Sequence, residues 1–142
     1  MLVSTKGRYA LRVMIDLAMH EDGRFVPLKE MADRQDISQK YMEAIMTQLS
    51  KANLLEAHHG KGGGFKLVRE PKDYKISEIL EVTESSLAPV SCLREDAEPC
   101  PKAEKCITLP MWKELYNVTK GYLDSVTLED LKEDSDVDID CL

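Results

Sequence analysis

The amino-acid sequence predicts a mainly α-helical fold with one small β-hairpin. Apolar residues recur at helical spacing from residue 4 to 20, from 27 to 35, from 38 to 54 and from 110 to 125. Two strand-like stretches, 55–59 and 65–68, flank residues 60–64, of which four are glycine. The chain has 142 residues, 43% of them hydrophobic and 32% charged, which suits one compact domain with an appendage.

The first three helices are arranged as a helix-turn-helix pattern. Ser4 is the expected N-cap of the first helix, Pro27 lies near the start of the short second helix, and Ser38 is the expected N-cap of the third. The third helix has a polar first turn followed by an apolar stripe. Together with the glycine-rich hairpin, these helices predict a winged helix-turn-helix domain over residues 1–84.

Such a domain places the leading end of its third helix in the DNA major groove and its hairpin on the backbone or in the minor groove. Arg8, near the start of the first helix, is a candidate phosphate contact, and Glu43 is a candidate for accepting a hydrogen bond from a cytosine amino group. The candidate DNA-binding residues are Arg8, Ser38, Gln39, Lys40, Tyr41, Glu43, His59, Lys61, Gly62 and Gly63.

Charge is distributed unevenly along the chain. The net charge is −7, but residues 1–75 carry 13 Lys and Arg against 10 Asp and Glu, whereas residues 76–142 carry 6 against 16. A mildly basic first half is compatible with a nucleic-acid partner. Lys6, Arg8, Arg12 and Asp16 interrupt the N-terminal apolar residues, so we expect neither a signal peptide nor a membrane span, and a cytoplasmic, reducing location.

The second half contains an irregular loop between two helical regions. A short helix beginning near Ser77 is followed by residues 85–108, which hold three prolines and three cysteines. Residues 109–134 predict a long helix and a short terminal helix that starts with a capping box at Thr127. Residues 135–142 form an acidic tail. The long helix is the candidate homodimer element, with packing on its own domain as the alternative; its dimerisation candidates are Trp112, Leu115, Tyr116, Thr119, Tyr122 and Leu123.

Cys92, Cys100 and Cys106 are separated by seven and then five residues. Zinc usually takes four ligands in closely spaced pairs, which these spacings do not provide. A structural disulfide is disfavoured in a reducing compartment, although a reversible redox switch is possible there. An iron–sulfur cluster tolerates looser spacing because it is larger than a single ion. Spacing alone leaves these readings open.

The segments STKGRYAL, GKGGGF, the cysteine loop and KCITLPMW together resemble the family of small winged-helix regulators that includes the iron–sulfur cluster regulator IscR, the nitric-oxide sensor NsrR and the cysteine-metabolism regulator CymR. The resemblance covers nearly the whole chain. It implies that Cys92, Cys100 and Cys106 ligate a two-iron or four-iron cluster whose state tunes DNA affinity. The seven-and-five spacing resembles that of some four-iron members.

The fourth ligand departs from the patterns of this family. Leu109 stands where IscR has a histidine, Arg8 stands where the nitric-oxide sensors have an acidic residue, and CymR lacks the three-cysteine loop. The remaining candidates are Glu95, Asp96, Glu98, Glu104, Cys141, a partner-subunit residue or a small exogenous thiol.

The sequence therefore predicts a homodimeric, sequence-specific transcription regulator of double-stranded DNA, controlled by an iron–sulfur cluster. A metal-free thiol–disulfide repressor and a winged-helix protein-interaction module are the alternatives. An enzyme is not expected, because His20, His58 and His59 show no grouping of nucleophile and base in the sequence.

Overall fold

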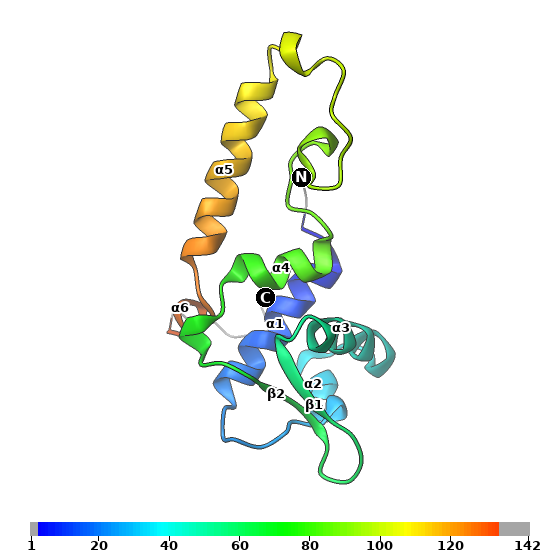
Figure 1. The fold of residues 1–142 in the computed structure, drawn as a ribbon. Coiled ribbons are helices and arrows are strands. Elements are labelled where there is room, and N and C mark those ends of the chain that lie inside the picture. The colour runs from blue at the N-terminus through cyan, green and yellow to red at the C-terminus, as the bar shows by residue number, and fades with distance from the viewer. Residues whose placement is uncertain (1–2, 134–142) are drawn as a thin grey trace.

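The computed structural model describes residues 3–133 of the chain. Its helices and strands in chain order are α1 (Thr5–Met19), α2 (Leu28–Gln35), α3 (Gln39–Lys51), β1 (Leu55–His58), β2 (Gly64–Leu67), α4 (Ile76–Glu84), α5 (Leu109–Ser125) and α6 (Leu128–Glu133) (Figure 1). Short 3₁₀ helices span Pro71–Asp73, Ser91–Leu93 and Ala103–Lys105. The predicted mainly α-helical fold with a two-stranded hairpin is confirmed.

Side-chain caps explain where several helices begin. The Ser4 hydroxyl accepts a hydrogen bond from Gly7 N at 3.1 Å, and the Ser38 hydroxyl accepts one from Tyr41 N at 3.2 Å. Before α6, Thr127 N donates to the Asp130 carboxylate at 2.9 Å, while Asp130 N donates to the Thr127 hydroxyl at 3.2 Å. This reciprocal pair is the capping box that the sequence predicted.

The turn between α2 and α3 depends on one residue in the left-handed region. Asp36 follows α2 with φ of 52°, and Ile37 N donates to Ala32 O at 3.0 Å. This C-terminal arrangement reverses the chain within three residues. Ile37 is then buried in the core, which fixes the angle between α2 and α3.

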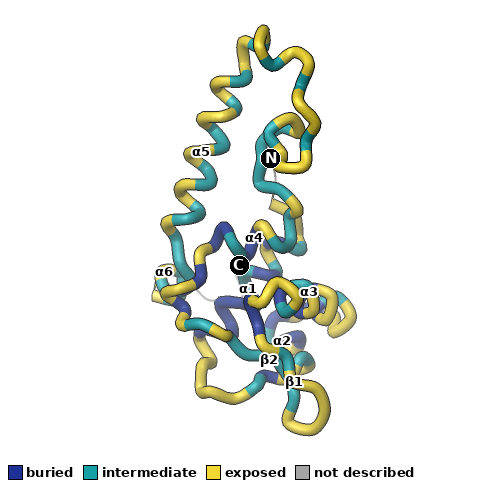
Figure 2. Tube along the Cα trace, viewed as in Figure 1, coloured by how far each residue is buried: buried dark blue, intermediate teal, exposed yellow. Residues whose placement is uncertain are grey.

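One hydrophobic core lies among α1, the helix-turn-helix pair, α4 and α6. Figure 2 shows the buried residues concentrated on these elements, whereas α5 carries none. α1 is central because it packs against α2, α3, α4, α6 and β2. Leu128 of α6 is fully buried, so the core receives a residue from beyond α5.

The hairpin pairs β1 and β2 antiparallel, with Leu55 opposite Leu67 and His58 opposite Gly64. Val26 adds an isolated bridge on the other side of β2: Val26 N donates to Phe65 O at 2.8 Å, and Phe65 N to Val26 O at 2.9 Å. The segment before α2 thereby holds the wing against the helical domain.

The cysteine-bearing loop leads away from the domain after α4, and α5 returns beside it to the domain (Figure 1). The C-terminal end of α5 is attached to α4 through Lys120, whose Nζ lies 2.6 Å from a Glu81 carboxylate oxygen, and through the Ser77 hydroxyl, which donates to Asp124. At the start of the loop, the Glu84 carboxylate accepts hydrogen bonds from Ser4 N at 3.2 Å and from Ser4 Oγ at 2.5 Å. The loop is therefore joined at its beginning to the first turn of α1.

Among residues 3–133, no helix combines the length and hydropathy needed to cross a membrane.

Candidate nucleic-acid interface and cysteine loop

The leading end of α3 presents polar side chains to solvent. Ser38, Gln39, Lys40 and Glu43 are exposed, and Tyr41 is half-buried. The opposite face of the helix is anchored in the core by four fully buried residues, Met42, Ile45, Met46 and Leu49. A rigid helix that carries an exposed polar end has the form that reads base edges in the major groove.

The first turns of α1 lie next to this end of α3. The Tyr9 ring meets the Tyr41 ring edge-on, with ring centroids 5.7 Å apart and an interplanar angle of 79°. Arg8 precedes Tyr9 and is exposed. It is therefore available to a phosphate beside the groove that α3 would enter.

The tip of the wing is shaped by its glycines. Gly60 and Gly62 have φ of 93° and 74°, which side-chain-bearing residues rarely adopt. A Cβ added to Gly63 would lie 2.3 Å from the backbone oxygen of His58, so no side chain fits there. His59 and Lys61 are exposed on this tight turn, where a narrow tip and a cation suit contact with a DNA backbone.

The base of the wing is held by aromatic contacts. The Phe25 ring lies 5.3 Å from the His58 ring, and Lys66 Nζ lies 4.8 Å from the Phe25 centroid. Behind the hairpin, the fully buried Tyr74 hydroxyl donates to Leu54 O at 2.8 Å and accepts from Val68 N at 2.9 Å. These contacts fix the wing relative to the end of α3.

The three loop cysteines are free thiols with different surroundings. Cys92 is exposed, whereas Cys100 and Cys106 are half-buried. Cys92 and Cys100 line one open hollow, in which Asp96 and Glu98 also take part. Cys106 lies instead near the start of α5, with its sulfur 3.5 Å from the Thr108 hydroxyl. That hydroxyl and the neighbouring backbone N–H groups lower the pKa of the Cys106 thiol.

The three cysteines offer the donor atoms that an iron–sulfur cluster needs, but they are not gathered into a metal site among the described residues. Three free thiols on a loop outside the core are the donor set that such clusters use. Within the described residues, however, no three Cys, His, Asp or Glu side chains are arranged to hold a metal ion. Cys92 and Cys100 share one hollow, whereas Cys106 is not among the residues that line it.

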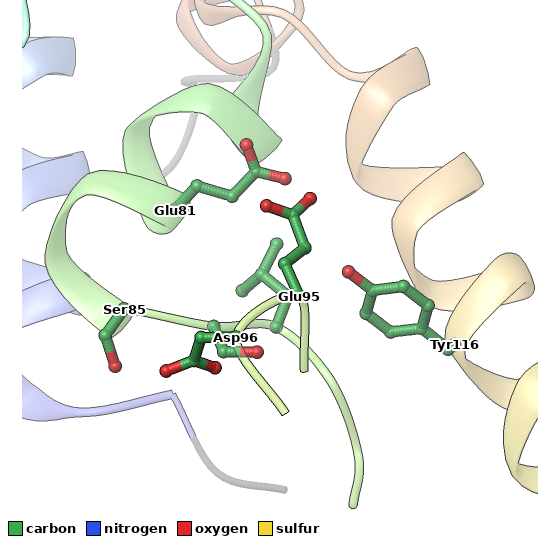
Figure 3. Close-up of a pocket in the computed structure, with 7 residues that line it drawn as sticks. Glu81, Ser85, Glu95, Asp96 and Tyr116 are labelled. Atoms are coloured by element: carbon green, nitrogen blue, oxygen red, sulfur yellow. The ribbon is translucent and has the colours of Figure 1, made fainter. Parts of the chain in front are cut away.

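An acidic hollow of about 360 Å³ lies between α4, the loop and α5. Figure 3 shows the carboxylates of Glu81 and Glu95 pointing toward one another, with the Tyr116 hydroxyl facing the same space. Lys120 offsets the charge of Glu81 through its contact at 2.6 Å. The hollow thus places a loop acid, Glu95, opposite the two helices that the loop connects.

The other fourth-ligand candidates differ in availability. Asp96 is engaged by Arg94, whose Nε and Nη2 lie 3.0 and 3.1 Å from its two carboxylate oxygens, and these hydrogen bonds lower its pKa. Glu98 and Glu104 are exposed. Cys141 lies outside the described residues.

α5 has an apolar side that its own domain leaves uncovered. Met111, Val118 and Tyr122 are 54%, 60% and 69% exposed, and Leu115 lies between them at helical spacing. Of the predicted dimerisation residues, Leu115 and Tyr122 are on this side, whereas Leu123 packs against the core. Sequence reasoning missed Met111 and Val118, although their spacing to Leu115 and Tyr122 was visible in the sequence.

A model of the Rrf2 family, described as iron-dependent transcriptional regulators, matches residues 3–134. This chain belongs to the Rrf2 family. The expectation of a transcription regulator rather than an enzyme is confirmed by the family and by the names of its relatives.

Three Rrf2-type relatives indicate how close the similarity is. The HTH-type transcriptional regulator IscR of Photorhabdus laumondii is 31% identical over 137 residues, which are 96% of this chain and 82% of that protein. Among solved structures, the global cysteine regulator CymR of B. subtilis has a TM-score of 0.75 and 34% identity, covering 94% of this chain and 97% of that one. IscR of T. potens has a TM-score of 0.71 and 33% identity, covering 95% and 88%. The winged-helix fold of this Rrf2 protein is thereby confirmed.

Proposed function

We propose that this Rrf2 protein is a cytoplasmic regulator that binds a specific DNA operator through residues 1–84. The observation that carries the proposal is that one domain presents both the exposed polar end of α3 and the glycine-shaped wing tip. Lys40 on α3 and Lys61 on the wing supply cations at the two places where DNA backbone would pass.

Selection of binding sites from a random duplex library, followed by titration at several salt concentrations, tests this function. We expect a preferred sequence, with affinity that falls steeply as salt rises. Lys40→Ala should weaken binding and reduce the salt slope by about one unit. Lys113→Ala, which removes an exposed lysine from α5, is the matched control and should leave the slope unchanged. Absence of any selected sequence would refute the proposal and favour a protein-interaction module.

The regulator acts as a homodimer in this proposal, with residues 109–134 supplying the contact between subunits. Support comes from the exposed side of α5, because a row of large apolar side chains is costly to leave in water. Operators with two half-sites also favour a two-fold symmetric protein. Sedimentation velocity of the full chain tests the assembly.

Cys92, Cys100 and Cys106 hold an iron–sulfur cluster in this proposal, in the loop of residues 85–108. The three free thiols and the similarity to IscR proteins support this assignment. A bound cluster would supply an oxidation-sensitive group that links iron supply or redox state to DNA affinity.

Anaerobic reconstitution with iron and sulfide, followed by absorption and paramagnetic resonance spectroscopy, tests the cluster assignment. We expect thiolate-to-iron bands that each single Cys→Ala change at the three loop positions weakens. Cys141→Ala separates a fourth thiolate in the tail from a ligand elsewhere. Absence of these bands from the wild-type protein, with spectra of the cysteine variants no different from it, would contradict the cluster assignment.

A metal-free thiol switch is the second candidate. It is favoured by Cys92 and Cys100, which line the same hollow as free thiols. Mass analysis under non-reducing conditions after mild oxidation should then show an intramolecular disulfide, and DNA affinity should change with it.

A further inference from the structure

The turn between α2 and α3 is held by two side chains of α1 that the sequence analysis did not assign to DNA recognition. Arg12 and Tyr9 are both half-buried, one turn apart on the same side of α1. Arg12 contacts the residue before the turn, and Tyr9 contacts a residue just after it. The two therefore bracket the Asp36–Ser38 turn from one rigid helix.

Arg12 secures the C-terminal end of α2. Its Nε donates to Gln35 Oε1 at 3.1 Å, and its Nη2 donates to the backbone oxygen of Gln35 at 3.0 Å. Gln35 is the last residue of α2, so its carbonyl has no further helical turn to pair with. The residue is also only 3% exposed, which keeps water from this carbonyl. The planar guanidinium satisfies both oxygens at once, and its charge also suits the negative end of the helix.

Tyr9 continues the contact to α3. The Arg12 guanidinium carbon lies 5.3 Å from the Tyr9 ring centroid, and the Tyr9 ring also meets the ring of Tyr41, 5.7 Å away in the first turn of α3. No hydrogen bond of the Tyr9 hydroxyl takes part in this row. The contact is made by the ring itself, between a cation and the edge of a second ring.

We propose that Tyr9 and Arg12 are positioning residues for DNA recognition, which hold the leading end of α3 at the angle that its base-contacting side chains require. The inference rests on the proposed DNA-binding function and deepens it. Fully buried residues, among them Val13, Met14 and Met42, keep α1 packed on the domain without this row. Loss of the row should therefore leave the fold intact and relax the end of α3.

Full-length Arg12→Lys, Tyr9→Leu and Tyr9→Phe variants test the inference against a selected duplex and an unrelated duplex. Lysine lacks the planar fork that pairs with both Gln35 oxygens, and leucine removes the ring, so each should weaken selected-duplex binding about tenfold. Binding to the unrelated duplex and its salt slope should stay unchanged. Tyr9→Phe keeps the ring and should bind as the wild type does. Arg24→Lys is the matched control, because Arg24 pairs with Asp22 and Glu30 away from α3.

The double variant Tyr9→Leu with Arg12→Lys should bind the selected duplex only slightly less tightly than the single variant with the lower affinity. Each change alone already disrupts the same set of contacts among Arg12, Tyr9 and Tyr41. Thermal midpoints identify any variant that fails to fold, and the conservative Arg12→Lys then decides. Wild-type affinity in both Arg12→Lys and Tyr9→Leu would overturn the inference. So would an equal loss on both duplexes, since these residues would then affect contact with the DNA backbone and not recognition of the sequence. A wild type without sequence preference would instead overturn the DNA-binding function itself.

Discussion

Tyr74→Phe removes one hydroxyl that ties the end of α3 to the base of the wing. The Tyr74 side chain is fully buried, and its hydroxyl makes three hydrogen bonds to the backbone. It donates to Leu54 O at 2.8 Å and accepts from Val68 N at 2.9 Å and from Arg69 N at 3.2 Å. Phenylalanine fills the same space, so the change isolates these hydrogen bonds from the packing of the ring.

The three backbone groups that bind the Tyr74 hydroxyl differ in what the loss of this hydrogen bond costs. Leu54 is 4% exposed, so its carbonyl is left unpaired in the core at a cost of about 1 to 3 kcal/mol. Val68 is 46% exposed, and its N–H can bind water at a cost of about 0.5 kcal/mol, with a similar cost for Arg69. We therefore expect Tyr74→Phe to lower the free energy of unfolding by about 2 to 4 kcal/mol, or the melting temperature by about 6 to 12 °C.

Urea unfolding at one fixed protein concentration measures this loss, because dimer stability depends on concentration. Thr47→Val is the control, since Thr47 is exposed on α3 outside the proposed dimer contact and should change the free energy of unfolding by less than about 0.5 kcal/mol. A loss below about 0.5 kcal/mol for Tyr74→Phe would refute the reasoning.

The pH dependence of stability provides a second measurement of the role of the Tyr74 hydroxyl. Burial raises the pKa of Tyr74 above its ordinary value. The unfolded phenol therefore ionises first, so wild-type stability should fall as pH rises past about 10. Tyr74→Phe should lack this part of the pH dependence.

Three further outcomes follow from other contacts. Asp16→Asn removes a 1% exposed carboxylate whose Oδ2 lies 2.8 Å from Arg34 Nη2, and urea unfolding should show a loss of about 2 to 4 kcal/mol, with less than about 1 kcal/mol contradicting the pairing. Hydrogen bonds from Arg24 and Arg34 lower the pKa of Glu30 to about 2, so its contribution to stability is present above its unfolded pKa of 4.5 and is lost as pH falls toward 2. Glu30→Gln should make the thermal midpoint depend less on pH over that range. A pH dependence identical to that of the wild type would contradict the role given to Glu30. Val118→Lys places a charge on the exposed side of α5 and should give a monomer in sedimentation velocity; a retained dimer would place the interface elsewhere.

The elements of the fold were predicted well because local signals are strong in this chain. Ser4 and Ser38 cap α1 and α3 as expected, and the Thr127–Asp130 capping box begins α6. Helix periodicity and N-caps depend on neighbours within four residues, which a sequence displays directly. The strand ends differ by one residue, since β1 ends at His58 and β2 begins at Gly64. Strand ends depend on the partner strand, which local patterns do not describe.

The candidate site was predicted in part. The polar end of α3 and the glycine wing were found from the sequence, because their residue types are unusual for the interior of a domain. The contacts among Arg12, Tyr9 and Tyr41 were missed, because Tyr41 lies 29 residues after Arg12 and 32 after Tyr9 in the sequence. Arg12 and Tyr9 themselves look like ordinary residues of one helix. Nor do the cysteine spacings reveal that Cys92 and Cys100 share a hollow while Cys106 lies by Thr108.

The sequence by itself determined the helices, the wing, the position of the three thiols in one loop and the resemblance to a family of DNA-binding regulators. Each of these is a local property of residue type and spacing. The tertiary structure alone decided that α1 braces the turn before α3, that Tyr74 joins the wing to the end of α3, and that α5 keeps an uncovered apolar side. These features depend on how distant segments pack, because the core holds residues from α1 to α6 in one geometry that no short stretch of sequence specifies.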